Sequence, residues 1–165
     1  MVRCFIILMM LLSIMRALAQ EPVGCDKFKW PLAQERALLA KPARIVSGAA
    51  MPHPLQTAVK LALMPFREAK LPVAPSHRPK LANSYAGFLR VAAVAKAGIY
   101  RITLSHPAWI DVIQSGRILK SSGFTGAAGC DGLAKSVKFD LAAAPFIIEL
   151  SGSAARESAL VVTGD

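Results

Sequence analysis

The sequence has few of the residues that build metal centres and disulfide-rich scaffolds. Its 165 residues include three cysteines, three histidines and ten acidic residues. Three cysteines are too few for the dense disulfide framework of a small secreted scaffold. The histidines, His53, His77 and His106, lack the spacing of a metal-binding pair, so we predict no bound metal and no cofactor. An iron site of two histidines and one carboxylate would require two of them to converge in the fold.

The sequence also lacks the short motifs of common enzyme classes. It contains no G-x-S-x-G elbow, no Walker loop and no G-x-G-x-x-G fingerprint, so we predict no catalytic residue. A glycine-rich run, 123–129, precedes Cys130 rather than a helix and is expected to form a flexible loop. Any two of the late acidic residues could form a glycosidase pair, so none is specified. They are Asp131, Asp140, Glu149 and Glu157.

Only one stretch of the chain is a long hydrophobic run. Residues 4–15 follow Arg3 and precede Ala17-Leu18-Ala19, a small-x-small cleavage site. This is the pattern of a secretory signal peptide, residues 1–19, cleaved after Ala19. A run of about 12 residues is too short for a spanning helix, which needs roughly 20. We therefore expect a periplasmic or secreted protein with no transmembrane segment in the mature chain.

Positive charge exceeds negative charge, with a formal net charge of +10 at pH 7. The excess is concentrated in residues 20–80, which carry ten basic and four acidic side chains. An exported basic protein is attracted to anionic envelope components, acidic polysaccharide or an acidic protein, although plain solubility explains the charge equally well. No aromatic residues interleave with a basic cluster, so nucleic acid is not an expected partner.

Residues 20–84 show a mixture of helix, loop and strand signals. Pro31 suits a first helical position and, with three leucines on one face, predicts a short helix over 26–40. Prolines predict loops over 42–56 and 65–84, and apolar alternation between them favours a strand over 57–64, with a helix possible there too.

From residue 85 onward, short alternating runs are bounded by glycine, proline and serine. This spacing predicts an antiparallel, jelly-roll-like β-sandwich with a short N-terminal helix, forming one domain over 20–165 with its main strands in 85–165. The expected strands are 86–94, 98–104, 108–114, 117–121, 136–141, 146–151 and 158–163.

The segment 98–121 supplies the only charged constellation that the pattern allows. Turns at His106-Pro107 and Ser115-Gly116 would set Asp111 opposite both Arg101 and Lys120. One face would then be apolar, formed by Tyr100, Ile102, Leu104, Ile110, Val112 and Leu119. The other face is mixed, and its candidate ligand-binding residues are Trp109, Asp111, Arg101 and Lys120. The alternative is a cross-strand ion-pair ladder, with Trp109 packed under the N-terminal helix.

Several segments resemble a group of uncharacterised exported proteobacterial proteins. They are Cys25-Asp26-Lys27-Phe28-x-Trp30-Pro31-Leu32, residues 98–104, residues 108–112 and Cys130 with residues 135–139. The resemblance implies an envelope setting and a paired Cys25 and Cys130, but no established activity. Some members carry a homogentisate dioxygenase label, and that enzyme's iron site needs a histidine and glutamate motif that is absent here. A looser similarity is to the β-sandwich appended to secreted peptidases.

Taken together, the residues favour an exported, non-catalytic protein of binding or envelope interaction. A metal-dependent dioxygenase or a hydrolase of the periplasm is the alternative.

Loss of Cys4 with the signal would leave Cys25 and Cys130, an even pair that in an oxidising compartment predicts a disulfide. A loop of about 100 residues closed this way is worth roughly 4 to 5 kcal/mol in the chain-entropy model. Free-thiol labelling of the unreduced mature protein is therefore expected to find no thiol. Two reactive thiols would contradict the pairing.

Overall fold

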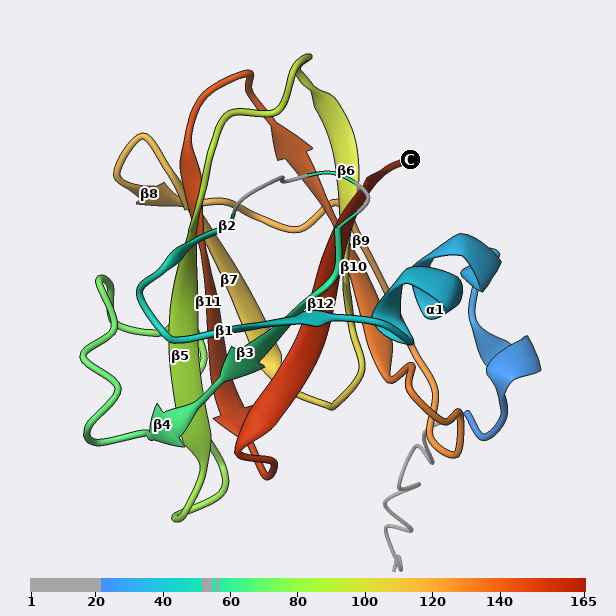
Figure 1. Ribbon diagram of the computed structural model, residues 1–165, viewed down its shortest axis with the longest axis horizontal. Helices are drawn as coiled ribbons and strands as arrows, with labels where there is room; N and C mark the ends of the chain where they lie inside the picture. Colours follow the sequence, from blue (N-terminus) through green and yellow to red (C-terminus); the bar gives the residue numbers. More distant parts are fainter. Residues whose placement is uncertain (1–21, 52–54, 56) are drawn as a thin grey trace, which may run out of the picture.

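The protein is a sandwich of two β-sheets with one short helix on its outside, as the computed structural model of residues 22–51, 55 and 57–165 shows (Figure 1). The predicted signal peptide, 1–19, lies outside these described residues. Within them, no helix is long and apolar enough to cross a membrane. The first sheet has the order β1 (Ala43–Ile45), β3 (Val59–Ala62), β12 (Glu157–Gly164), β6 (Gly98–Leu104), β10 (Lys135–Leu141), β9 (Gly123–Gly126). The second has the order β2 (Ala50–Met51), β5 (Tyr85–Val91), β11 (Phe146–Ser153), β7 (Trp109–Gln114), β8 (Arg117–Ile118), with β4 (Met64–Pro65) also on β5.

Alternating apolar side chains form the core between the two sheets. Ile102 and Leu104 of β6 are fully buried, as is Val112 of β7 in the opposite sheet. All six residues predicted for the apolar face belong to this core, Leu119 at its margin. The mainly β fold and the sandwich are therefore confirmed, because period-2 alternation places one side of each strand inward.

The predicted pairing of β6 with β7 is wrong. Arg101 of β6 lies opposite Lys138 and Thr163 in the first sheet, whereas Asp111 of β7 lies opposite Glu149 in the second. The connection through His106-Pro107 passes from one sheet to the other instead of closing a hairpin. Alternation sets the face of each strand but does not identify its neighbour, so the faces were predicted correctly and the partners were not.

The predicted turn at Ser115-Gly116 is confirmed. It joins β7 to β8 with Gln114 opposite Arg117, and both turn residues have positive φ, 52° for Ser115 and 73° for Gly116. Two positive φ angles are typical of the type I′ turn, whose twist suits a hairpin. The Val112 carbonyl also accepts a hydrogen bond from the Leu119 N–H, which continues the register toward Lys120.

Three short strands occur where loops were predicted: β1 and β2 lie in the proline-bounded segment 42–56, and β9 occupies the first part of the glycine-rich run. A fourth, β4, spans the boundary between the predicted strand 57–64 and the predicted loop 65–84. In β9, Gly126 pairs with Lys135 and Gly123 pairs with Lys138, so this run extends the first sheet instead of forming a flexible loop. The pairs of β1 with β3 and of β2 with β5 are parallel, which departs from the purely antiparallel expectation.

The N-terminal segment covers the outer face of the first sheet (Figure 1). The helix α1 spans Ala33–Leu39 and is shorter than the predicted 26–40, because residues 25–27 form a separate 3-10 turn and Phe28 is extended. A disulfide joins Cys25 to Cys130, as predicted. The apolar layer beneath the helix consists of Leu32, Leu39, Ala58, Cys130, Leu133, Ala159 and Val161.

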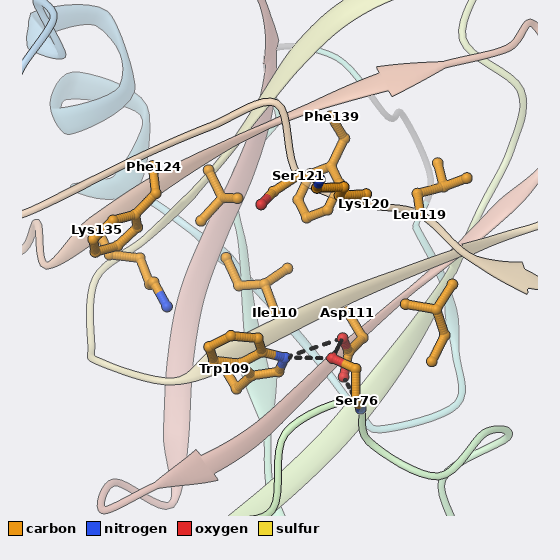
Figure 2. Close-up of a pocket in the computed structure, with 12 residues that line it drawn as sticks. Ser76, Trp109, Ile110, Asp111, Leu119, Lys120, Ser121, Phe124, Lys135 and Phe139 are labelled. Carbon is orange, nitrogen blue, oxygen red and sulfur yellow. Dashed lines mark hydrogen bonds between the residues drawn. The ribbon is translucent and has the colours of Figure 1, made fainter.

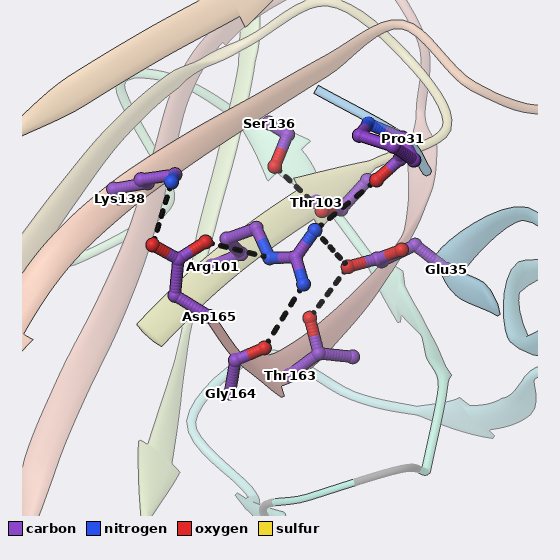
Figure 3. Close-up of polar contacts among 9 residues, drawn as sticks. All are labelled: Pro31, Glu35, Arg101, Thr103, Ser136, Lys138, Thr163, Gly164 and Asp165. Carbon is purple, nitrogen blue, oxygen red and sulfur yellow. Dashed lines mark hydrogen bonds and ion pairs between the residues drawn. The ribbon is translucent and has the colours of Figure 1, made fainter. Parts of the chain in front are cut away.

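Buried charges fasten the helix to the sheet beneath it (Figure 3). The Glu35 carboxylate is 1% exposed, accepts a hydrogen bond from Thr163 at 2.7 Å and pairs with Arg101 at 3.2 Å. Arg101 also donates to the carbonyl groups of Pro31 and Gly164 and pairs with Asp165 at 3.5 Å. Arg101 therefore has a structural role that joins both ends of the described chain.

Removal of the Glu35 carboxylate should destabilise the fold strongly. Glu35→Ala would leave Arg101 without its buried partner, which typically costs about 3 kcal/mol or more. The matched control is Glu157→Ala, since Glu157 pairs with Arg44 and Lys60 at the surface and its loss should cost less than about 1 kcal/mol. Urea unfolding of both variants measures the difference. Equal losses would contradict the anchoring role of Glu35.

Candidate binding groove

Trp109 at the start of β7 presents an exposed indole that is held by hydrogen bonds (Figure 2). Trp109 is 40% exposed, whereas Asp111, two residues further along β7, is 3% exposed. The indole N–H donates to Ser76 Oγ at 2.9 Å and to Asp111 Oδ1 at 3.0 Å. The Ser76 hydroxyl also bonds to Asp111, and its N–H donates to Asp111 Oδ2 at 3.0 Å. Asp111 thus fixes both the indole and the segment that carries Ser76.

Two further rings and one cation surround this indole. His77 stacks on Trp109 with ring centroids 4.6 Å apart. The Lys135 ammonium lies 5.5 Å from the Trp109 ring centroid and 5.3 Å from that of Phe124, which is half exposed. It also donates to the Ala108 carbonyl at 2.8 Å. Figure 2 shows the ammonium between the two rings, where cation–π attraction stabilises its position.

A groove of about 550 Å³ opens beside Trp109, between the edge strands of the two sheets. β7 and β8 form one wall, and β9 and β10 form the other. The connection 119–122 crosses from one sheet to the other, and its residues Leu119, Lys120 and Ser121 also line the groove. The groove is lined by Ser76, Trp109, Ile110, Asp111, Ile118, Leu119, Lys120, Ser121, Phe124, Lys135, Val137 and Phe139.

A second hollow of about 450 Å³ lies on the other side of Trp109. Its lining includes His77 and Leu81 and shares Trp109, Phe124 and Lys135 with the first groove. These three shared side chains therefore form a partition between two adjoining recesses.

Behind Asp111, a second carboxyl is buried in the same outer face. Glu149 of β11 lies directly opposite Asp111, is 1% exposed and accepts a hydrogen bond from the Val73 N–H at 3.0 Å. Burial raises the pKa of Glu149, the Val73 hydrogen bond opposes this rise, and the negative charge of Asp111 adds to it. Its Oε2 atom is buried with no hydrogen-bond partner. The two carboxyl groups thus hold the segment 73–76 against the sheet.

Three of the four predicted ligand-binding residues line one groove. Trp109, Asp111 and Lys120 are together, whereas Arg101 lies on the outer face of the other sheet with Glu35. The alternative placement of Trp109, under the N-terminal helix, is wrong, because Trp30 occupies that position and stacks beneath Lys138.

The sequence did not identify Ser76, Phe124 and Lys135 as site residues. Ser76 lies in a proline-rich segment with no periodic signal, and Phe124 stands in the run that was taken for a flexible loop. Lys135 is 26 residues from Trp109 and reaches it only because β10 and β7 face each other across the sandwich. Knowledge of the sheet order would have been needed to find them.

Among the described residues, no three or more histidine, cysteine, aspartate or glutamate side chains gather as metal ligands would. No protein-family model, curated protein or solved structure matches the chain.

The raised pKa of Glu149 predicts a specific pH dependence of stability. The folded protein holds this proton to higher pH than the unfolded chain, so ionisation of Glu149 lowers stability as pH rises from about 4.5 toward neutrality. The free energy of unfolding of Glu149→Gln, relative to the unmodified protein, should increase between pH 4 and pH 7. Urea unfolding at each pH measures it, with the surface variant Glu157→Gln as the control for loss of one charge. A difference independent of pH would contradict the assignment.

Proposed function

We propose that this protein is an exported, non-catalytic binding protein that takes up an anionic component of the cell envelope in the groove beside Trp109. The observation that carries this proposal is an exposed indole in a fixed orientation. An indole left 40% exposed forfeits part of the apolar burial that makes tryptophan useful in a core. Yet two hydrogen bonds and a stacked ring restrain it, so its orientation is set before a ligand arrives.

The engagement of the acidic groups supports binding over catalysis. Both oxygens of Asp111 accept hydrogen bonds from Ser76 or Trp109, and Glu149 is buried behind the segment that Asp111 holds. A general acid or base needs a carboxyl group that reaches the substrate within hydrogen-bond distance. Here the carboxyl groups position a binding surface instead.

The charge of the chain and its cysteine pair support the choice of partner. Residues 20–165 carry 18 basic and ten acidic side chains, an excess that favours anionic partners, and Lys120 and Lys135 bring two positive charges to the groove itself. The Cys25–Cys130 disulfide and the predicted signal peptide agree with a place outside the cytoplasm, where envelope components are encountered.

Replacement of Trp109 separates a binding role from a core role. Trp109→Ala should abolish binding and cost less than about 2 kcal/mol of stability, well short of the roughly 3–5 kcal/mol for a fully buried tryptophan. The matched control is Trp30→Phe, which removes a buried indole N–H that has no partner and should leave binding intact. Thermal unfolding measures the stability of both variants, and isothermal titration calorimetry, which needs no tryptophan, measures their binding.

The titration uses four probes at two salt concentrations. They are phosphatidylglycerol vesicles, phosphatidylcholine vesicles, polygalacturonate and maltotriose. In the Trp30→Phe background, the emission of Trp109 should change saturably with an anionic probe, and less strongly at high salt. A large loss of stability in Trp109→Ala, with probe binding unchanged, would show a core residue and refute the proposal.

A further inference from the structure

The geometry points to the class of occupant: we propose that the groove beside Trp109 binds an anionic amphiphile, with its apolar chain between the sheets and its charged head at Lys120 and Lys135. This inference rests on the proposed binding function and specifies its ligand. It is drawn from three features of the groove, namely its floor, its polar atoms and its cations.

The floor of the groove is made of core side chains. Ile110, Val137 and Phe139 belong to the apolar core between the sheets, and Leu119 packs against that core. The first three are at most 6% exposed, so they meet the groove only at its base. A chain that enters here replaces water against apolar surface, which favours binding by roughly 25 cal/mol for each Å² removed from water.

The polar groups beside Trp109 are not open to the hydroxyl groups of a neutral sugar. A sugar needs hydrogen-bond donors and acceptors that are open to its hydroxyl groups. The Asp111 oxygens, the Ser76 hydroxyl and the Trp109 N–H instead bond to one another (Figure 2). The apolar surface of the groove therefore dominates recognition of the ligand body.

The cations of the groove determine the sign of the head group. Lys135 is held between the rings of Trp109 and Phe124, and Lys120 is an exposed residue on the connection that lines the groove. The one carboxylate in the lining, Asp111, is 3% exposed and turned to its own hydrogen bonds. Two positive charges above an apolar floor complement a negative head on an apolar chain.

The size of the groove agrees with one small molecule. Its volume of about 550 Å³ lies within the range of roughly 300–1,000 Å³ that is usual for small-ligand sites.

Three probes that share a chain or a head test the proposal directly. Dodecyl phosphate, dodecyl maltoside and inorganic phosphate are titrated, below micelle-forming concentrations, into the mature Trp30→Phe protein while the emission of Trp109 is recorded. Dodecyl phosphate should bind at least tenfold more tightly than dodecyl maltoside, which has the same chain. Inorganic phosphate alone should bind at least a hundredfold more weakly, because it lacks the chain. Tight binding of inorganic phosphate would identify a free-phosphate site and overturn the proposal.

Matched variants assign the head and the chain to separate parts of the groove. Lys120→Glu should remove the preference for phosphate over maltoside, whereas Lys96→Glu, an equal charge change on a residue outside the groove, should preserve it. Phe124→Ser should weaken both chain-bearing probes about tenfold, and Val46→Ser, at an exposed apolar position outside the groove, should weaken neither.

The outcomes separate this proposal from the one on which it rests. Binding of polygalacturonate at Trp109, without binding of dodecyl phosphate, would overturn the amphiphile and leave the anionic binding function intact. Binding of the neutral maltotriose alone would overturn both proposals. Equal effects of Lys120→Glu and Lys96→Glu would also overturn it, because the head group would then respond only to net charge. A Trp109 emission unchanged by every probe in both panels would overturn both proposals.

Discussion

The face-to-face packing of two apolar sheet surfaces is the constraint on which the rest of the structure depends. Strands such as β6 and β7 bury one face against the opposite sheet. Their outer face is either covered by another segment of the chain or exposed to solvent. At the edge of the second sheet, β8 pairs only with Ile113 and Gln114 of β7. The start of β7 is therefore left beside a groove, with Ile110 turned to the core and Trp109 turned outward. The groove is a consequence of this incomplete pairing at the sandwich edge.

The outer faces of the two sheets are covered by different chemistry. On the first sheet, α1 covers an apolar layer and is fastened by the disulfide and by the Glu35–Arg101 pair. On the second, a proline-rich segment without regular structure is held through backbone N–H groups by Asp111 and Glu149. A buried polar group without a hydrogen-bond partner is costly. When a carboxylate accepts a hydrogen bond from a backbone N–H, both the acceptor and the donor gain a partner. The same contacts place Ser76 and His77 against the Trp109 ring.

Local patterns in the sequence predicted local features, and long-range features escaped them. The class of fold, the inner residues of β6 and β7 and the turn at Ser115-Gly116 follow from alternation and turn chemistry, which act over a few residues. The partner of Arg101 depends on sheet order, which those patterns do not contain. Lys120 lies with Trp109 and Asp111 as expected, because a short hairpin connects their strands. Lys135 and Phe124 belong to the other sheet, so the local pattern could not predict that they line the same groove. The residues of β9 were predicted to form a loop because glycine usually weakens a strand. In the structure, Gly126 and Gly123 nevertheless pair with Lys135 and Lys138.

The proposed binding role requires the Trp109 indole to be exposed and yet rigid before any ligand binds. Nuclear magnetic relaxation of the indole N–H in the ligand-free protein tests this claim most directly. The hydrogen bonds to Asp111 and Ser76 and the stacked His77 ring predict an order parameter near that of a rigid backbone, about 0.85. An order parameter below about 0.6 would describe a freely moving side chain and would contradict the preformed binding surface.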